Sequence, residues 1–433
     1  MASRSDDRTR FDRYVERLAE GVGHADRRCP LEAYLTGLLL GGDRKSVEPM
    51  AAKVDPRHVS RTHQSMHHFV ANAPWDDRAV LAIARDYALA QLERHAPVGA
   101  WVVDDTAIPK KGKHSVGVTR QYCGVRGKQD NCQVAVSVSL ANRTMSVPAA
   151  WRLYLPEAWA ADPERRARAG IPDDVGFRKK WQIALKEIDE LLAEDLPPAP
   201  VVADAGYGDT TEFREGLTRR GFSYALGVKS ATSVWPPGKE PLSPKRYAGL
   251  GRPATRVRRD QRHRPVSVRA FALSLPDKTW ATVRWREGTK GTMRSRFAAL
   301  RVRPAHRDEL RTEPRPIEWL LIEWPTGAPE PTKYWLSTVP EDVELADLVS
   351  LAKIRWRIER DYQELKDELG LDHYEGRGWR GFHHHGTLCI AAYCFLAAER
   401  GRLSPPQPVA FLQPASLPRG FVPRGSSRKA RKT

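Results

Sequence analysis

The spacing of hydrophobic residues changes along the chain and predicts regions of different structure. In residues 1–95 the apolar positions recur at helical spacing, as at Phe11, Tyr14, Val15 and Leu18, and this period predicts helices. From residue 96 the apolar residues run continuously or alternate with polar ones, which is typical of strands. The strands expected here are 98–106, 133–140, 146–156, 198–204 and 222–229, and the helices are 177–196 and 211–221.

A second change of pattern begins at residue 230. Residues 230–315 are rich in proline and arginine, and the strands expected there are short: 265–273, 278–285 and 295–302. Longer apolar patterns then return, with strands expected at 317–324 and 332–339 and helices at 344–370 and 383–403.

These patterns predict an α/β fold with a mixed sheet, because strands come first and strand–helix alternation follows. Residues 96–229 and 316–403 would form this domain, and 230–315 a β-rich insertion in it. Residues 1–95 would form a helical N-terminal domain, either a DNA-binding module or a plain helical bundle. The basic tail, 404–433, is expected to be disordered.

Composition narrows the class of partner and the compartment. The formal net charge is +18 in 433 residues, which favours a polyanion such as nucleic acid; a generally basic protein is the alternative. The five cysteines form no CxxC pair, which argues against a disulfide scaffold and against a structural zinc site. No apolar run reaches the roughly 20 residues that span a bilayer, and the N-terminus has no signal-peptide pattern. We therefore expect a cytoplasmic protein.

Acidic residues mark the ends of two expected strands. Asp104 and Asp105 end the first, and Asp204 ends another just before a glycine-containing turn. Carboxylates at strand ends commonly line the functional edge of an α/β sheet, although many such residues only cap turns.

A third acidic candidate lies in the helix expected over 344–370. At about 100° per residue, Arg355, Glu359, Tyr362 and Lys366 form a polar stripe along one edge of the apolar face. Asp361 falls near the apolar face itself, and the pattern gives no reason for it. The stripe has two interpretations: an ordinary solvated helix with an Arg–Glu pair, or a carboxylate flanked by cations that hold a phosphodiester.

Several motifs occur in an order that resembles a known family. The sequence WVVDDTAIPKKGKHSVGVTRQYCGVRGKQDNCQVAVSVSL is followed by VVADAGYG, YWLSTVP and RWRIERDYQELKDELGL. Together they resemble the DDE transposases of bacterial insertion sequences, and within the broader family-4 group they are most similar to the insertion-sequence 701 family. The resemblance covers roughly residues 30–400.

The resemblance implies a ribonuclease-H-like catalytic domain with three metal-binding carboxylates. Carried onto this chain, they are Asp105, Asp204 and Glu359. Asp105 is chosen over Asp104 because the family motif places the catalytic aspartate directly before the threonine. Arg355 and Lys366 match DNA-contacting positions, whereas the tyrosine that the broader group has three residues before the arginine is Ala352 here.

The implied reaction uses two Mg²⁺ ions, for which Mn²⁺ could substitute, because hard carboxylate oxygens suit these ions and paired ions catalyse phosphodiester chemistry. Water would free a 3′-OH at the transposon end, and that 3′-OH would attack target DNA. The implied partners are double-stranded DNA carrying terminal inverted repeats, the target DNA and a second protomer in a synaptic complex. Such a protein would be associated with the nucleoid.

Three further groups of residues are candidates for DNA contact. Lys110, Lys111 and Lys113 follow the first carboxylates and could neutralise phosphates, or could simply form a solvated loop. In the broader group a flipped base of a hairpin end stacks on a tryptophan of the insertion, and Trp280 and Trp285 are the candidates, with Trp285 preferred. The histidine run 383–385 is expected to be a polar helix start or a DNA-facing patch, since adjacent helical residues point in different directions and do not form one metal site.

Two other classes of function remain open. One is a DNA-binding protein that has lost catalysis and acts as a repressor or a relic. The other is a nuclease with the same metal chemistry and no strand transfer.

Overall fold

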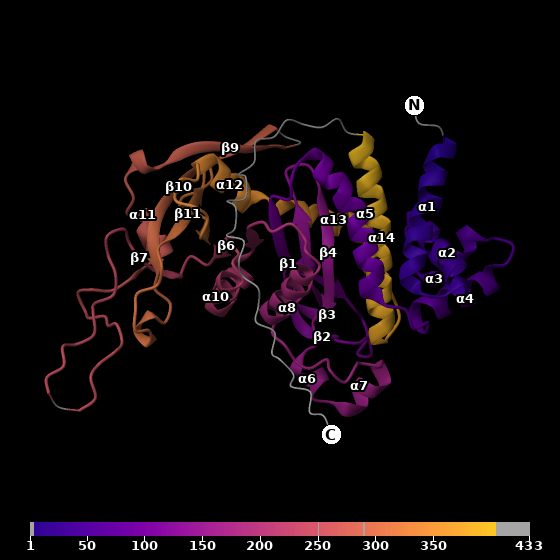
Figure 1. Ribbon diagram of the computed structural model, residues 1–433, viewed down its shortest axis with the longest axis horizontal. Helices are drawn as coiled ribbons and strands as arrows, with labels where there is room; N and C mark the ends of the chain where they lie inside the picture. Colours follow the sequence, from indigo (N-terminus) through magenta and orange to yellow (C-terminus); the bar gives the residue numbers. More distant parts are fainter. Residues whose placement is uncertain (1–3, 250, 289–290, 404–433) are drawn as a thin grey trace, which may run out of the picture.

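The computed structural model describes residues 4–249, 251–288 and 291–403. Its N-terminal part is helical, and four helices gather at one end of the molecule (Figure 1). These are α1 (Arg4–Val22), α2 (Arg28–Leu39), α3 (Val47–Val54) and α4 (Val59–Ala71). A fifth helix, α5 (Asp77–His95), starts at an Asp76 cap and packs along the strand β4 (Ser146–Leu153) and the helix α14 (Trp379–Leu403). One continuous hydrophobic core runs from these helices into the sheet.

The central sheet explains where the acidic residues lie. Its strands are β1 (Ala100–Pro109), β2 (Thr119–Cys123), β3 (Lys128–Ala141), β4 (Ser146–Leu153), β5 (Val201–Ala203) and β6 (Tyr224–Val228). The order β4-β3-β1-β5-β6 has β1, β5 and β6 parallel and β3 antiparallel to both of its neighbours. This mixed α/β arrangement fits a ribonuclease-H-like fold.

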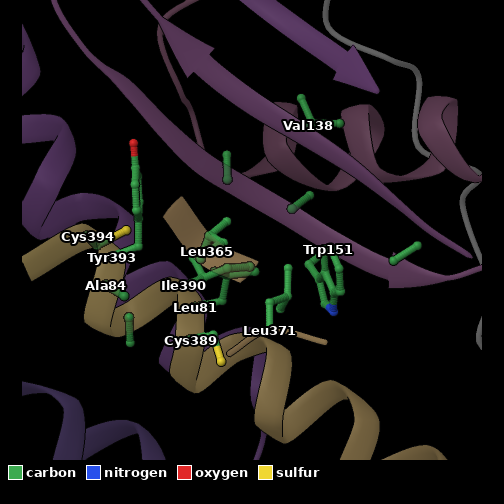
Figure 2. Close-up of a cluster of buried hydrophobic side chains, with 14 of the residues drawn as sticks. Leu81, Ala84, Val138, Trp151, Leu365, Leu371, Cys389, Ile390, Tyr393 and Cys394 are labelled. Carbon is green, nitrogen blue, oxygen red and sulfur yellow. The ribbon is translucent and has the colours of Figure 1, made fainter. Parts of the chain in front are cut away.

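Helices cover both faces of this sheet. The helices between β4 and β6 are α6 (Glu157–Ala160), α7 (Pro163–Ala169), α8 (Lys180–Ala193), α9 (Ala205–Gly208) and α10 (Thr211–Arg219). Helix α8 packs on β3 and β4, and α10 packs on α8. On the other face, α14 (Trp379–Leu403) packs along α5, and α13 (Trp356–Asp367) packs on α14, β1 and β4. Figure 2 shows Trp151 of β4, Leu365 of α13 and Ile390 of α14 in that shared core.

The region that follows β6 extends the same sheet. It contains β7 (Ser233–Trp235), β8 (Val266–Ser267), α11 (Val268–Leu273), β9 (Ala281–Gly288), β10 (Gly291–Pro304), β11 (Glu318–Trp324) and β12 (Lys333–Ser337). Strand β12 pairs with β6, β11 with β12, and β10 with β11, so the sheet continues outward to the end opposite α1–α4 (Figure 1).

One expected strand is wrong. Most of 265–273 is the helix α11, because the Ser267 hydroxyl caps it by accepting from the backbone N–H of Ala270. Val268, Phe271 and Ala272 are buried on one side of it, at the three- and four-residue spacing of a helix.

Two remaining expectations concern membranes and the tail. In the described part of the chain, no helix combines the length and the apolar character needed to cross a membrane. The expected disordered tail, 404–433, lies outside the described residues.

Candidate active site

The pairing of β1 with β5 places two carboxylates side by side. The parallel register aligns Val102 with Val202 and Val103 with Ala203. One step further along, Asp104 and Asp204 are neighbours. Because strand residues alternate between faces, Asp104 shares a face with Val102, and Val102 and Val202 belong to the same hydrophobic cluster.

Asp204 is held by the start of a short helix. It is the N-cap of α9, and its Oδ1 accepts hydrogen bonds from the backbone N–H groups of Gly206 at 2.9 Å and Tyr207 at 3.3 Å. Its Oδ2 accepts none from the described residues. An aspartate before a glycine turn favours this geometry, since a capping carboxylate satisfies otherwise unpaired N–H groups.

The third carboxylate comes from a helix that packs on the same face. The helix expected over 344–370 is divided into α12 (Leu345–Lys353) and α13, with the break at Ile354 and Arg355. Ile354 and Ile358 are buried in the cluster that contains Val102. This packing turns Arg355 toward the strands and leaves Glu359 exposed.

Arg355 connects the helix to the strand. Its Nη1 donates to Asp104 Oδ2 at 2.7 Å, and its Nη2 donates to Glu359 Oε1 at 2.6 Å. The adjacent Tyr362 hydroxyl hydrogen-bonds Ser137 of β3, so two side chains of α13 contact the sheet beside the carboxylates.

The electrostatics reflect a concentration of negative charge. Asp104 is 7% exposed. Burial raises its pKa to about 7, with Asp105 and Asp204 adding to the rise and Arg355 opposing it. A divalent cation would relieve this repulsion, and oxygen ligands of this kind suit Mg²⁺ or Mn²⁺. As arranged, no group of three or more His, Cys, Asp or Glu side chains within the described ranges is set to hold a metal ion, since Arg355 bridges Asp104 and Glu359.

Asp105 lies on the opposite face. Its Oδ2 is 2.5 Å from Nζ of Lys180, which lies in the first turn of α8. The structure therefore brings Asp204 and Glu359 together with Asp104, and gives Asp105 a different partner. Lys180 was not singled out from the sequence, because nothing in a single helix-start lysine indicates which strand it meets.

Two of the expected DNA-contacting lysines donate to backbone carbonyl groups. Lys366 Nζ donates to Ala107 O at 3.0 Å, and Lys110 Nζ donates to Tyr374 O at 2.6 Å. Burial lowers the pKa of both, to about 8 for Lys110. Lys111 and Lys113 are exposed.

Asp361 now has a structural account. It is 4% exposed, and its Oδ1 accepts a hydrogen bond from the Tyr393 hydroxyl of α14 at 2.6 Å. Burial raises its pKa to about 6. It joins α13 to α14 instead of facing the other carboxylates.

The expectation for the histidine run is wrong. Helix α14 starts at Trp379, before the run, and His383, His384 and His385 are each 2% exposed. These side chains are part of the interior and present no face to DNA.

A large groove adjoins the carboxylates. Its volume is about 1950 Å³, and Asp204, Arg355 and Glu359 line it. Other cations on its walls come from β6, β9, β12 and α13 and their ends: Lys229, Arg284, Arg286, Lys333, Arg357 and Arg360.

Trp285 also lines this groove. Its ring stands edge to face with Phe297 at 5.6 Å between centroids, and Nζ of Lys353 lies 4.5 Å from its centroid. Lys353 in turn pairs with the buried Glu323 at 2.5 Å. Trp280 instead packs against Trp324, with 5.1 Å between ring centroids.

The sheet order, the neighbouring carboxylates and the basic groove fit a nuclease of the DDE type, and comparison with known families identifies this class. The family model described as "DDE superfamily endonuclease" matches residues 17–292, which is more than half of the chain. The protein belongs to this family, and endonucleases of this superfamily depend on divalent metal ions.

A named relative narrows the resemblance. The chain is 30% identical over 168 residues to "Probable transposase for insertion sequence element IS701" from Microchaete diplosiphon, an alignment that covers 39% of this chain and 41% of the relative. The DDE class predicted from the sequence motifs is confirmed, and the predicted resemblance to the insertion-sequence 701 family agrees with the name of this relative. The matched part spans about two fifths of the relative's length.

Proposed function

We propose that this protein is a DNA transposase that cuts at the inverted-repeat ends of an insertion sequence and joins the 3′-OH ends to target DNA. The observation that carries the proposal is that Asp204 and Glu359 line a basic groove, and that Arg355 links Glu359 to a β1 aspartate beside Asp204. In a family of endonucleases, a site of this composition beside a polyanion-binding surface supports phosphodiester chemistry.

The carboxylates would hold the divalent ions. Bound there, two Mg²⁺ or Mn²⁺ ions would activate the attacking oxygen and stabilise the leaving one. Asp204 suits this role because its Oδ1 is fixed by backbone N–H groups while Oδ2 accepts no hydrogen bond in the described part of the chain. Glu359 suits it because its side chain is exposed on the groove.

The surrounding cations would hold DNA. When the carboxylates bind metal, Arg355 would be released from them to contact a phosphate, since guanidinium groups bind phosphate oxygens in pairs. Lys111 and Lys113, which are exposed in the loop that follows β1, would offer further contacts to phosphates. Lys366 and Lys110 would act by positioning the segments that they join, and Trp285 would offer a ring at the groove wall for an unstacked base.

The remaining parts complete a working assembly. The helical region 1–95 would contribute to recognition of the terminal repeats, and the strands of 230–315 would form the outer wall of the DNA path. Because two ends must be joined, we propose a dimer of this chain on two ends. Gel filtration of the protein with repeat-bearing DNA tests it, and one protomer holding two ends would contradict it.

The experiment that tests the function is cleavage of a plasmid carrying the flanking repeats, with Mg²⁺ or Mn²⁺, by wild type and by Glu359→Ala. Wild type should cut at the repeat ends, and the variant should be slower by about 10³-fold, which corresponds to roughly 4 kcal/mol of lost transition-state stabilisation. Glu341→Ala is the matched control, because Glu341 is exposed and pairs with Arg301 outside the groove.

Each other result has a defined meaning. Equal cutting by wild type and Glu359→Ala would remove Glu359 from the site. Cutting without joining would indicate a nuclease. Binding to the ends with no cutting by either protein would indicate a DNA-binding relic.

A further inference from the structure

The two adjacent aspartates of β1 cannot serve the same site. Neighbouring residues of a strand point to opposite faces of the sheet, and β1 is regular through both positions, since Asp104 pairs with Ser137 and Asp105 with Val136 of β3. One of these two aspartates therefore faces the helix that carries Glu359, and the other faces away from it.

The position of Asp104 follows from what packs on each face. Val102, two residues before it, packs with Val202, Ile354 and Ile358. Asp104 continues that face, and the β1–β5 register brings it beside Asp204. Ser137, which is directly opposite Asp104 on β3, contacts Tyr362 of α13. The packing of Val102 and the contact of Ser137 with Tyr362 thus place Asp104 on the face that α13 covers.

The position of Asp105 follows in the same way. Trp101 shares its face, and the Trp101 indole N–H donates to Pro197 O, in the segment that follows α8, at 2.9 Å. Asp105 itself pairs with Lys180 at the start of that helix. Its carboxylate would have to cross the sheet to reach Glu359.

We infer that Asp104, and not Asp105, is the β1 carboxylate that binds the divalent ion together with Asp204 and Glu359. The inference rests on the proposed function and corrects the carry-over from the Asp–Thr motif. Arg355 supports it, because one guanidinium bonds both Asp104 and Glu359 and so marks the place where a cation is shared between them. The pair of Asp105 with Lys180 then has a structural role, because it fixes β1 against α8 on the face away from Glu359.

The test is Mn²⁺ binding to the full-length protein, measured from the electron paramagnetic resonance signal of free Mn²⁺. The matched variants are Asp104→Asn and Asp105→Asn, which remove the same charge from adjacent positions. Asp104→Asn should weaken Mn²⁺ binding at least about tenfold, since even residues that only orient metal ligands change affinity by 10–100-fold. Asp105→Asn should change it by less than about threefold, because the Asp105 carboxylate lies on the other face of the sheet and acts on the ions only through weak long-range repulsion. Repeat-end cleavage should follow the same order.

The outcomes separate this assignment from the function itself. Loss of binding in Asp105→Asn alone, or equal loss in both variants, would overturn the assignment and leave the proposed function standing. Absence of Mn²⁺ binding and of cleavage in wild type would overturn the proposed function and the assignment with it.

A third variant keeps the test decisive if Asp104→Asn does not fold, as judged by circular dichroism. Lys180→Met frees Asp105 from its cation. If Asp105 were a metal ligand, this change should strengthen Mn²⁺ binding several-fold, and that result would overturn the assignment. If Asp104 is the ligand, Lys180→Met should leave the affinity unchanged.

Discussion

The carboxylates around Arg355 and the histidine run of α14 are two polar clusters that differ in their hydrogen-bond partners. Asp104 and Glu359 are joined mainly through one arginine side chain, and they adjoin a groove. In the histidine run, ring nitrogens bond backbone groups and a tyrosine deep in the interior. Charges gathered at the cost of mutual repulsion indicate a ligand site, whereas a polar group whose partners are backbone atoms indicates structure.

The histidine bonds show what this second cluster does. His383 donates from Nδ1 to Trp379 O and accepts from the Leu153 N–H, which joins α14 to β4. His385 donates from Nε2 to Gly370 O and accepts from the Tyr34 hydroxyl of α2. Both arrangements satisfy a neutral ring.

His384 completes the run from the side of α4. Its ring stacks on Trp75, and both of its ring nitrogens face carbonyl oxygens, of Val70 and Trp75. The run therefore attaches the N-terminal helices to the sheet. For His384, burial lowers the pKa, whereas the hydrogen bonds to the two carbonyl groups raise it.

The largest expected effect comes from truncating one member of each cluster. His385→Ala removes two hydrogen bonds and a ring stacked on Tyr374, so the free energy of unfolding should fall by about 2–4 kcal/mol. Glu359→Gln should change it by less than about 0.5 kcal/mol, as for most surface substitutions. Denaturant titrations at pH 7.5 measure both, and a comparable loss in the two variants would remove the distinction between the clusters.

The next effect is the pH dependence of the His385 contribution. Burial lowers the pKa of His385 to about 4, and nearby Lys110 and His373 act in the same direction. The ordinary pKa is about 6.5, so the unfolded chain binds the proton first as the pH falls. The stability that the neutral ring provides is therefore complete above about pH 6.5 and is lost toward pH 4.

A comparison of wild type with His385→Ala isolates the pH dependence that His385 contributes to stability. Asp104 and Asp361 have raised pKa values and gain stability over part of the same range as the pH falls, so the total profile mixes opposite signs. The difference in unfolding free energy between wild type and His385→Ala cancels their contribution. It should be about 2 kcal/mol smaller at pH 5 than at pH 7.5. A difference that does not change with pH would show that the ring binds a proton equally well in the folded and the unfolded chain, and would contradict the lowered pKa.

Features that depend on residue spacing within one segment, or on the order of motifs, could be predicted from the sequence. The strands that contain Asp104 and Asp204, the helix with Glu359, and the stripe of Arg355 and Tyr362 beside the apolar face all follow from spacing within one segment, and the structure shows those elements.

What could not be predicted depends on which segments meet. Choosing between Asp104 and Asp105 requires knowing that α13 covers one face and Lys180 the other. The helical pattern placed Asp361 near the apolar face. The reason for an aspartate there is its hydrogen bond with Tyr393 of α14, which the pattern within one helix cannot show. The histidine run was misjudged because the polar character of a residue does not reveal backbone partners that come from other helices.

The smallest expected effect concerns two adjacent lysines, Lys110 and Lys111, which differ in the same respect as the two clusters. Lys110 bonds the Tyr374 carbonyl and is largely buried, whereas Lys111 is exposed beside it. Lys111→Ala should reduce the slope of log affinity against log salt for repeat DNA by about 1, because one phosphate contact is lost, and should leave stability unchanged. Lys110→Ala should lower the unfolding free energy by about 1–2 kcal/mol with a smaller change in slope, because its ammonium group already donates to a carbonyl.

Fluorescence anisotropy across a salt series gives the slopes and denaturant titration gives the stabilities. Equal slope changes in the two variants would place Lys110 on the DNA and assign both lysines to the functional surface.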